Sequence, residues 1–274
     1  MSGERRAFGR CMILGAAWLA IAFLVLPMLV VFPVSLTDRY FLSLPQDALS
    51  FEHYANFFHS AEWLSATWQS FAIGVSASIA AMALGSLCAI GCWRLSSRAS
   101  EIVRALMLTP IIVPAIVHAL AFNRTWVQLD LLDSYLGVIL AHALIGMPYV
   151  VITVSASLAN FDPKLEQAAR NLGASLWQTV RYVIVPAIRP GVLSGGAIAF
   201  AISFDDIVVV LFITSRHIYT LPKRIWNGIQ DHLDPTIAVV ASLLIATTFA
   251  IVMTRHLVEK HRQLQRGVGA TEGR

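Results

Sequence analysis

Six long stretches with few or no charged residues constrain the fold of this 274-residue chain more than any other feature. Only 13% of the residues are charged and the mean hydropathy is +0.69, so the polar side chains are too few to cover a water-soluble globule of this size. A helix needs about 20 mostly apolar residues to cross a bilayer. We therefore predict an all-α membrane protein with six transmembrane helices. The six stretches are residues 11–37, 63–93, 105–123, 134–161, 190–215 and 235–254.

The distribution of Lys and Arg predicts how the chain lies in the membrane, because basic residues near spans are retained on the cytoplasmic side. If both termini are cytoplasmic, 15 of the 20 Lys and Arg residues lie in cytoplasmic segments and five lie in outer loops. We therefore predict an N-in, C-in topology, with residues 162–186 in a cytoplasmic loop between the fourth and fifth spans. The net charge of +4 follows from this asymmetry, so it gives no reason to expect nucleic-acid binding.

The spans are expected to form one membrane domain over residues 1–274, since no internal repeat or soluble domain separates them. Helix-breaking prolines occur inside several spans, and membrane proteins tolerate bent or broken helices where neighbours or a cavity satisfy the freed backbone groups. These prolines are Pro27, Pro33, Pro110, Pro114 and Pro148. Small residues recur every four positions in residues 81–89 and 191–195. This spacing predicts close helix packing within the subunit.

Sequence motifs for enzymatic chemistry are missing. There is no G-x-x-x-x-G-K-[ST], H-E-x-x-H or G-x-S-x-G, so we expect no enzyme activity and no ATP site in this chain. The three cysteines lack C-x-x-C spacing and indicate neither a disulfide framework nor a thiolate metal site. We interpret His118 and His142, within spans, as hydrogen-bonded interior residues. An intramembrane serine protease at Ser194 would need a nearby histidine, and the sixth span has none before His256.

The most polar passage is EQAARNLGASLWQTVRYVIVPAIRPG, which falls largely in the loop of residues 162–186. It predicts two short helices. Asp162 can cap the start of the first, and Gly173 can supply the left-handed residue that ends it. Ser175 can cap the second helix, which we expect to end before Pro186.

The first of these helices has one apolar and one polar flank. The helix is short and carries small side chains on one face, which suits docking in a groove of a partner protein. Two other interpretations remain: a DNA-binding helix-turn-helix, whose second helix would offer only Gln178 and Arg181 to nucleic acid, and an interfacial helix pair that merely links two spans. The apolar flank consists of Leu165, Ala168, Ala169 and Leu172, and the polar flank of Glu166, Gln167, Arg170 and Asn171.

The same passage resembles the cytoplasmic loop signature of the membrane subunits of binding-protein-dependent ABC importers, E-A-A-x3-G-x9-I-x-L-P. Gln167 stands where the signature has Glu, and Glu166 lies one place earlier. The resemblance continues through residues 187–212 and 219–229, which look most like spermidine/putrescine permease subunits. The matching positions are Ala168, Ala169, Gly173, Val183, Val185 and Pro186, with valines in place of the Ile and Leu.

The resemblance implies a multi-pass permease subunit in a bacterial inner membrane. In that family the loop is a coupling helix docked on a cytoplasmic ATPase, so ATP and Mg²⁺ belong to a partner chain and this chain needs no cofactor. The implied partners are an ABC ATPase dimer, a homologous but different second permease subunit, a periplasmic solute-binding protein and membrane lipid. The implied cargo is a small solute, a polyamine such as spermidine or putrescine. The implied coupling residues are Glu166, Gln167, Ala168, Ala169, Gly173 and Pro186.

Two adjacent acids, Asp205 and Asp206, interrupt the fifth span. A carboxylate at mid-bilayer costs about 2.5–3.5 kcal/mol, so both should face protein or water. Successive helical residues point about 100° apart, so the acids face one path only if the helix breaks there, with Ser203 or Asp205 as a cap. Either these three residues line a cation path, which the resemblance of SFDD to polyamine permeases favours, or they cap a helix and contact another subunit. Ile111 replaces an acid that polyamine permeases can carry, so another small solute is the alternative cargo.

A secondary transporter or channel that works without an ATPase is the remaining alternative function. Six spans without inverted halves, together with a capped loop that protrudes from the membrane, favour obligate partners instead.

Overall fold

The computed structural model describes residues 2–231 and 234–271, with side chains at residue 10, residues 12–230 and residues 234–260. Every regular element in these ranges is a helix, which confirms the all-α class. The contacts divide the chain into two compact units. These are Met1–Ala61 together with Asn227–Arg274, and Glu62–Trp226.

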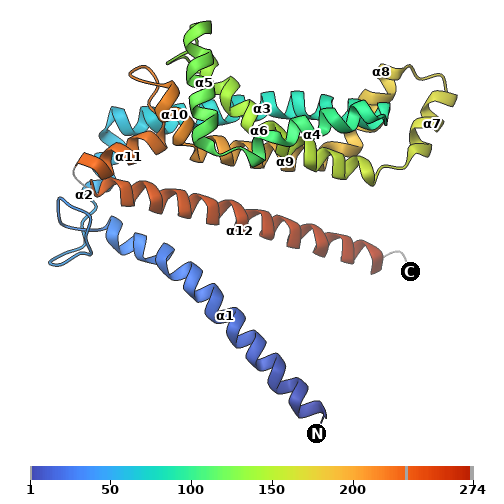
Figure 1. Ribbon diagram of the computed structural model, residues 1–274. Coiled ribbons are helices and arrows are strands. Elements are labelled where there is room, and N and C mark those ends of the chain that lie inside the picture. Colours follow the sequence, from blue (N-terminus) through green and yellow to red (C-terminus); the bar gives the residue numbers. More distant parts are fainter. Residues whose placement is uncertain (1, 232–233, 272–274) are drawn as a thin grey trace. The chain divides into compact units, whose positions relative to one another are not determined.

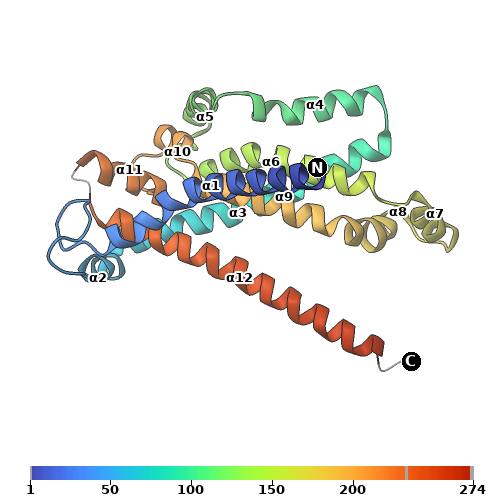
Figure 2. The same cartoon turned by 90° about the horizontal axis from the view of Figure 1, so that it is seen from below.

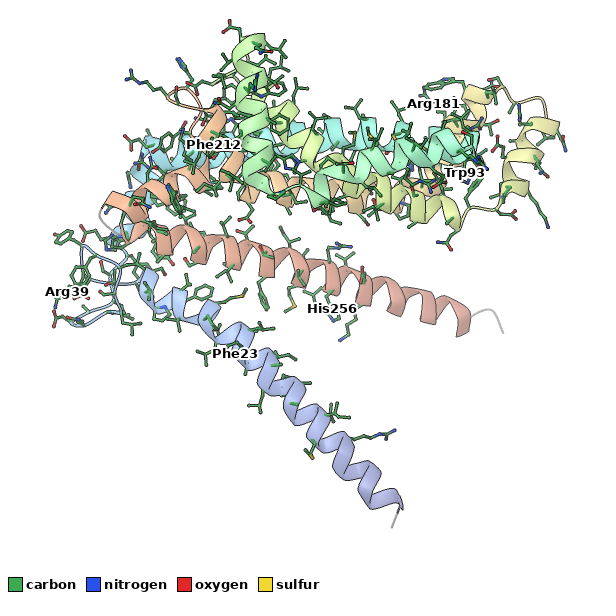
Figure 3. The ribbon with its side chains drawn as sticks, viewed as in Figure 1. Phe23, Arg39, Trp93, Arg181, Phe212 and His256 are labelled. Atoms are coloured by element: carbon green, nitrogen blue, oxygen red, sulfur yellow. The ribbon has the colours of Figure 1, made fainter. Side chains whose placement is uncertain are left out.

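The first unit contains α1 (Ser2–Ser35), α2 (Glu52–His59) and α12 (Thr236–Thr271). The Tyr54 hydroxyl on α2 lies 2.8 Å from Ser35 Oγ on α1 and 2.9 Å from Ser242 Oγ on α12, so it joins all three helices. The large apolar side chains of α1 are exposed, with Phe23 at 79% (Figure 3). Such a surface is stable in contact with lipid or with another membrane subunit.

The second unit is built on α3, α6 and α9, which run alongside one another and share its larger buried apolar cluster. α7 and α8 lie at one end of this bundle, and α10 lies at the opposite end (Figures 1 and 2). Its helices are α3 (Ala61–Leu95), α4 (Arg98–Ile112), α5 (Ala115–Leu129), α6 (Tyr135–Ala159), α7 (Pro163–Asn171), α8 (Leu176–Thr179), the π-helix η1 (Val180–Ile184), α9 (Val185–Asp205), α10 (Val208–Ile213) and the start of α11 (Leu221–Asp231).

Small residues bring α3, α6 and α9 close together. A Cβ added at Gly85 of α3 would lie 2.9 Å from Val150 Cβ of α6, and one added at Gly195 of α9 would lie 2.7 Å from Val150 Cα. Val150 is fully buried between them. The predicted close packing of residues 81–89 and 191–195 within the subunit is therefore confirmed.

Five helices of the described chain are long and apolar enough to cross a membrane, and a sixth span exists if a bent helix pair counts as one. The five are Met12–Ser35, Ala61–Leu95, Tyr135–Ala159, Leu176–Asp205 and Thr236–Lys260. They correspond to five of the six predicted stretches, and the bent pair corresponds to the third. The N-in, C-in orientation stays a prediction.

The predicted third span, residues 105–123, is two helices rather than one. α4 and α5 meet at an angle of 106° (Figure 1). The residue before a proline is driven out of the helical region by the proline ring, and Val113 before Pro114 is extended, with φ −77° and ψ 129°. Pro110 stays inside α4. The break therefore occurs at the second proline only.

The predicted boundaries of the fifth span, residues 190–215, are also wrong. The spanning helix begins at Leu176, passes Pro186 without a break and ends at Asp205. The wider turn of η1 precedes Pro186, which then occupies the first turn of α9, where the missing amide hydrogen is tolerated. We predicted that the second loop helix ends before Pro186. In the structure it continues past Pro186 into the span.

Candidate functional site

The helix α7 is fixed at both ends by local hydrogen bonds, as the sequence predicts. At its start, Asp162 Oδ1 accepts a hydrogen bond of 2.9 Å from the backbone N–H of Lys164. At its end, Gly173 has φ +88°, its N–H donates to Arg170 O at 2.9 Å, and the next N–H, of Ala174, donates to Ala169 O at 3.0 Å. These two hydrogen bonds form a Schellman motif, which satisfies the last carbonyls of the helix. The motif needs one residue with left-handed backbone conformation, and glycine adopts it at the least cost.

The chain after α7 passes directly into a membrane-spanning helix. Ser175 Oγ accepts from the backbone N–H of Gln178, and Gln178 Oε1 accepts from the N–H of Ser175 at 2.8 Å, which forms a reciprocal capping box. From Leu176 the helix continues to Asp205 through η1. The segment that carries α7 is therefore joined directly to one end of a 30-residue helix.

Each flank of α7 has one half-buried residue and is otherwise exposed. Glu166 and Ala169 are half-buried, whereas Gln167 and Ala168 are exposed. Leu172, just after the helix, is 89% exposed. No side chain of α7 is fully buried within the described part of the chain. The exposed side chains of α7 are mixed, and they are available to contact another protein: Leu165 and Ala168 lie among Lys164, Gln167, Arg170 and Asn171.

Two residues of α3 hold the inner side of this loop. Arg94 Nη2 lies 2.7 Å from Glu166 Oε1. The ring of Trp93 packs edge-on against Phe161, with 5.8 Å between the ring centroids. Sequence reasoning did not find Arg94, and its signal was only a basic residue at the end of a span.

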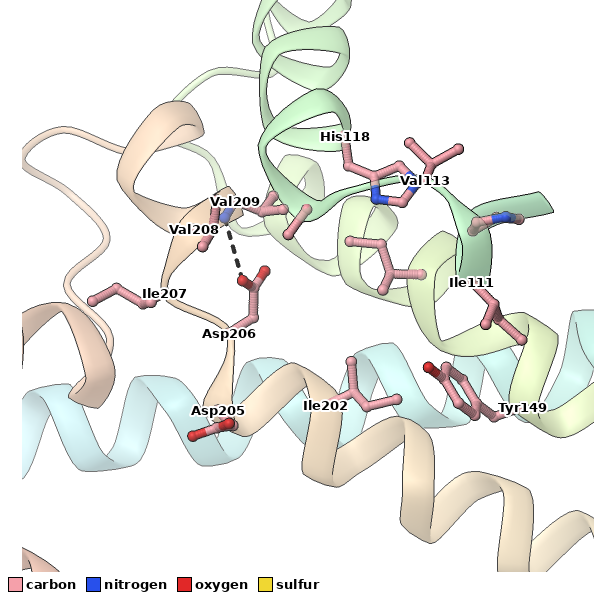
Figure 4. Close-up of a pocket in the computed structure, with 13 residues that line it drawn as sticks. Ile111, Val113, His118, Tyr149, Ile202, Asp205, Asp206, Ile207, Val208 and Val209 are labelled. Atoms are coloured by element: carbon pink, nitrogen blue, oxygen red, sulfur yellow. Dashed lines mark hydrogen bonds between the residues drawn. The ribbon is translucent and has the colours of Figure 1, made fainter. Parts of the chain in front are cut away.

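A second candidate site is an open cavity of about 460 Å³ in the same unit, formed where two interrupted helices meet (Figure 4). One wall is the break between α4 and α5 at Val113, and another is the break between α9 and α10 at Asp206. Tyr149 and Ile145 of α6 close the floor. Besides these residues, the cavity is lined by Pro110, Ile111, Ala115, His118, Ile202, Asp205, Ile207, Val208 and Val209.

Asp206 caps the helix that follows this break. Its backbone is extended, with φ −72° and ψ 118°. Its Oδ1 accepts a hydrogen bond of 3.3 Å from the backbone N–H of Val209 in α10 (Figure 4). We expected Ser203 or Asp205 to be the cap. The difference arises because Asp206 lies beyond the last helical turn, three residues before the amide that needs an acceptor.

Asp206 also belongs to a chain of three polar side chains. Its Oδ2 lies 3.2 Å from His142 Nε2, and His142 Nδ1 lies 2.7 Å from Ser203 Oγ. His142 is therefore the hydrogen-bonded interior residue that the sequence predicts. The residue types match a hydrolase triad, but Ser203 is buried between α6 and α9, so no substrate can reach its oxygen. The three side chains instead tie both helices to the break.

Asp205 and Asp206 point in different directions. Asp205 is exposed, and its carboxylate is directed away from that of Asp206 (Figure 4). Both still line the cavity. The two acids are thus separated by role, because one caps a helix and contacts a histidine while the other is available to a ligand.

Asp133 forms an anchor at the opposite end of the bundle from α7, and sequence reasoning missed it. Its carboxylate accepts hydrogen bonds of 2.9–3.2 Å from residues 215–218, namely four backbone N–H groups and the Ser215 hydroxyl. Burial alone would raise the pKa of Asp133, but the amides of His217, Ser215 and Arg216 outweigh it and hold this pKa well below its usual range. No motif in the sequence predicts this pairing.

Lys223 strengthens the same anchor. It is 7% exposed, and its Nζ donates to Thr214 Oγ1 at 2.9 Å and to the carbonyls of Thr214 and Ser215 at 3.3 and 3.1 Å. Burial lowers the pKa of Lys223, and the charge of Asp133 opposes this shift. Residues 214–220 are therefore held from two sides.

Comparisons with known proteins agree with this architecture. Residues 81–263 match the family model described as binding-protein-dependent transport system inner membrane component. The spermidine/putrescine transport system permease protein PotC of Haemophilus influenzae is 29% identical over 240 residues, which covers 87% of this chain and 93% of that protein. The trehalose transport system permease protein SugB of Mycobacterium tuberculosis is 26% identical over 250 residues, 88% of this chain and 91% of that protein.

A similar fold occurs in the crystal structure of a bacterial ABC transporter involved in the import of the acidic polysaccharide alginate. The TM-score is 0.72 at 15% identity, and the match covers 93% of this chain and 96% of that one.

Proposed function

Because this chain belongs to the family of binding-protein-dependent transport system inner membrane components, we propose that it is the permease subunit of an ATP-driven importer for a polyamine such as spermidine or putrescine. As a member, it is a multi-pass protein of the inner membrane and a transport component rather than an enzyme. A cytoplasmic ATPase dimer would supply ATP hydrolysis with Mg²⁺. A second, homologous permease subunit would complete the path, and a periplasmic binding protein would deliver the solute.

The observation that carries the proposal is the construction of α7. It is capped at both ends, presents an exposed surface that includes Gln167 and Ala168, and leads into a 30-residue spanning helix. The proposed contacts to the ATPase are made by Gln167 and Ala168, with Gly173 keeping the helix end in shape. Glu166 and Ala169, which are half-buried, would set how α7 is held, and Pro186 would set the first turn of the helix α9 that follows.

In the proposed mechanism, closure of the ATPase dimer on ATP displaces α7. The displacement passes along the helix Leu176–Asp205, which ends beside the cavity, just before the break at Asp206. There the helix break would allow one segment to move against the other, while the Ser203–His142 hydrogen bond keeps α9 attached to α6. Alternating access follows when the cavity opens to one side of the membrane and then to the other.

The cavity chemistry supports a cationic cargo with an apolar body. Its walls are mostly aliphatic, and Asp205 supplies an exposed carboxylate. An ammonium group would pair with Asp205 while methylene groups contact Ile111, Ile202 and Tyr149. The similarity to a spermidine/putrescine permease points to the same class of solute. A different small solute is the second candidate, since the trehalose permease matches over a comparable length.

Gly173→Val tests the coupling role. A β-branched side chain is strained at φ +88°, and an added Cβ at this glycine meets no atom within 4 Å, so the effect comes from backbone conformation rather than from a clash. We expect normal insertion and about tenfold lower ATP-driven uptake in proteoliposomes, from the loss of a coupling term of 1–3 kcal/mol. Gly15→Val is the matched control, because Gly15 also has open space but lies within the helix α1. Wild-type uptake by Gly173→Val would refute the assignment of α7.

A further inference from the structure

The last turn of α3 makes two contacts with the segment that carries α7. Arg94 and Glu166 form an ion pair at 2.7 Å, with side chains only 26% and 16% exposed. The neighbouring residue, Trp93, packs against the buried ring of Phe161, which lies just before the cap of α7. Figure 3 shows Trp93 at this end of the unit and Phe212 at the other.

The ion pair is distinctive in its environment. Among the described side chains it is the only ion pair between α7 and another helix. Charge pairs that are partly removed from water interact more strongly than fully exposed ones, because the local dielectric constant is lower. Losing one partner would leave the other half-buried and unpaired. The position of α7 relative to α3 therefore depends on this pair.

The position of the acid explains why the pair forms. Neighbouring residues on a helix point about 100° apart. Glu166 accordingly faces α3 and is half-buried, while Gln167 faces outward and is exposed. The acidic group of this loop is thus used inside the chain, and the outward position next to it carries no charge.

The other end of α3 holds the Asp133 anchor region. Gln69 Oε1 accepts from the backbone N–H of Tyr219 at 3.0 Å, and the buried Ser70 Oγ accepts from the N–H of Leu221 at 2.7 Å. From Ser70 to Arg94 the helix rises by about 36 Å at 1.5 Å per residue. One continuous helix therefore contacts α7 at one end and the loop of residues 214–220 at the other.

We propose that α3 is a second mechanical connection between the coupling helix and the opposite end of the bundle, and that Arg94 and Glu166 are the positioning residues that attach α7 to it. The proposal rests on the coupling function proposed above for α7. The covalent connection runs through α8 and α9 to the cavity. The connection through α3 runs to residues 214–220, so both ends of the unit respond to one displacement of α7.

The test uses the assembled complex of this chain with its ATPase and second permease subunit, in a background with the three cysteines replaced by serine. An environment-sensitive fluorophore on Arg216→Cys reports the loop of residues 214–220, because that side chain is exposed. Two quantities are measured: the rate of ATP hydrolysis and the amplitude of the ATP-dependent fluorescence change. Neither requires the cargo to be known.

We expect Arg94→Glu to reduce the amplitude of the fluorescence change by about fivefold, because typical couplings between two sites correspond to factors of about five or more. The ATPase should still bind and hydrolyse ATP. Arg94→Lys should retain most of the change, and the exchange Arg94→Glu with Glu166→Arg should restore it. Glu166→Gln is a milder variant for the case that charge reversal prevents assembly. Arg98→Glu is the matched control, because Arg98 carries the same charge near the same end but is exposed.

Each outcome decides the proposal. A wild-type fluorescence change in Arg94→Glu, or failure of the exchanged pair to restore it, overturns the role of α3. If Gly173→Val abolishes the change while the Arg94 variants do not, the coupling function of α7 stands and the inference about α3 falls. If the ATPase does not associate with the wild-type chain, both fail together.

Discussion

The two ends of the unit Glu62–Trp226 are held in opposite ways. At the end with α10, the Asp133 carboxylate takes five hydrogen bonds from residues 215–218, and the buried Lys223 binds the carbonyls beside them. At the end with α7, one half-buried ion pair and one ring contact hold a helix with no fully buried side chain in the described chain. A dense network fixes a loop in one geometry, whereas few contacts leave a capped helix able to shift as a body.

The largest effect is expected at the dense end, from Asp133→Asn. An amide offers one acceptor oxygen where the carboxylate offered two, and it directs N–H groups at backbone donors. We expect a loss of about 3 kcal/mol in the free energy of unfolding, since hydrogen bonds to a charged acceptor contribute about 1.5–3 kcal/mol and several are weakened together. Asp130→Asn is the matched control, because Asp130 and Asp133 both have positive φ, 55° and 51°, which Asn tolerates. Thermal unfolding in detergent gives the melting temperatures of both variants. Equal melting temperatures would contradict the role of Asp133 as an anchor.

Lowering the pH should remove the same stabilisation. The pKa of Asp133 in the folded state lies below its unfolded value of about 3.9, so its contribution is complete above that value and is lost as the pH falls below it. The wild-type chain and Asp133→Asn should therefore differ in melting temperature at pH 7 and converge towards pH 2. Melting curves at several pH values test this, and a difference that stays constant down to pH 2 would contradict it.

An intermediate effect is expected at the cavity, from Asp206→Leu. The change leaves the Val209 amide and His142 Nε2 without their carboxylate, which should cost about 2 kcal/mol. Asp206→Asn keeps an acceptor oxygen and should cost less than half as much. Melting temperatures of the two variants separate a capping role from a purely electrostatic one, since the second predicts equal losses.

A small effect on stability is expected from Glu166→Gln at the α7 end. A single partly exposed ion pair contributes about 1 kcal/mol or less. The same variant should still reduce the ATP-dependent signal described above. If its melting temperature falls as far as that of Asp133→Asn, the contrast between the two ends is wrong.

The smallest effect on stability is expected from Asp205→Asn, since its exposed carboxylate supports no other element of the described chain, and such changes stay within about 0.5 kcal/mol. Uptake of radiolabelled spermidine should nevertheless fall, because the cavity loses its exposed negative charge. Trehalose serves as the uncharged control solute. Unchanged spermidine uptake would remove Asp205 from the proposed cation path.

Local chemistry explains which features were predictable from the sequence. Span lengths depend on runs of apolar residues, so five of the six stretches overlap a single helix that is long enough to span. The caps of α7 at Asp162 and Gly173 depend on residues adjacent in the chain, and both are confirmed. The family depends on a spaced signature, and the family match confirms the family.

Features that join distant segments were not predictable in the same way. Whether a proline breaks a helix depends on its surroundings, so Pro114 ends α4 whereas Pro110 and Pro186 do not end theirs. The pairing of Asp133 with residues 215–218, and of Arg94 with Glu166, requires segments more than 70 residues apart to meet.

The sequence by itself determined that much of the surface faces lipid, and it determined the local geometry of the loop of residues 162–186, because hydrophobicity and capping act over a few residues. Only the tertiary structure decided which carboxylates are anchors, which one is a cap and which one remains open to a ligand. The physical reason is that a carboxylate's role depends on the donors that surround it, and helix packing brings those donors from remote parts of the chain.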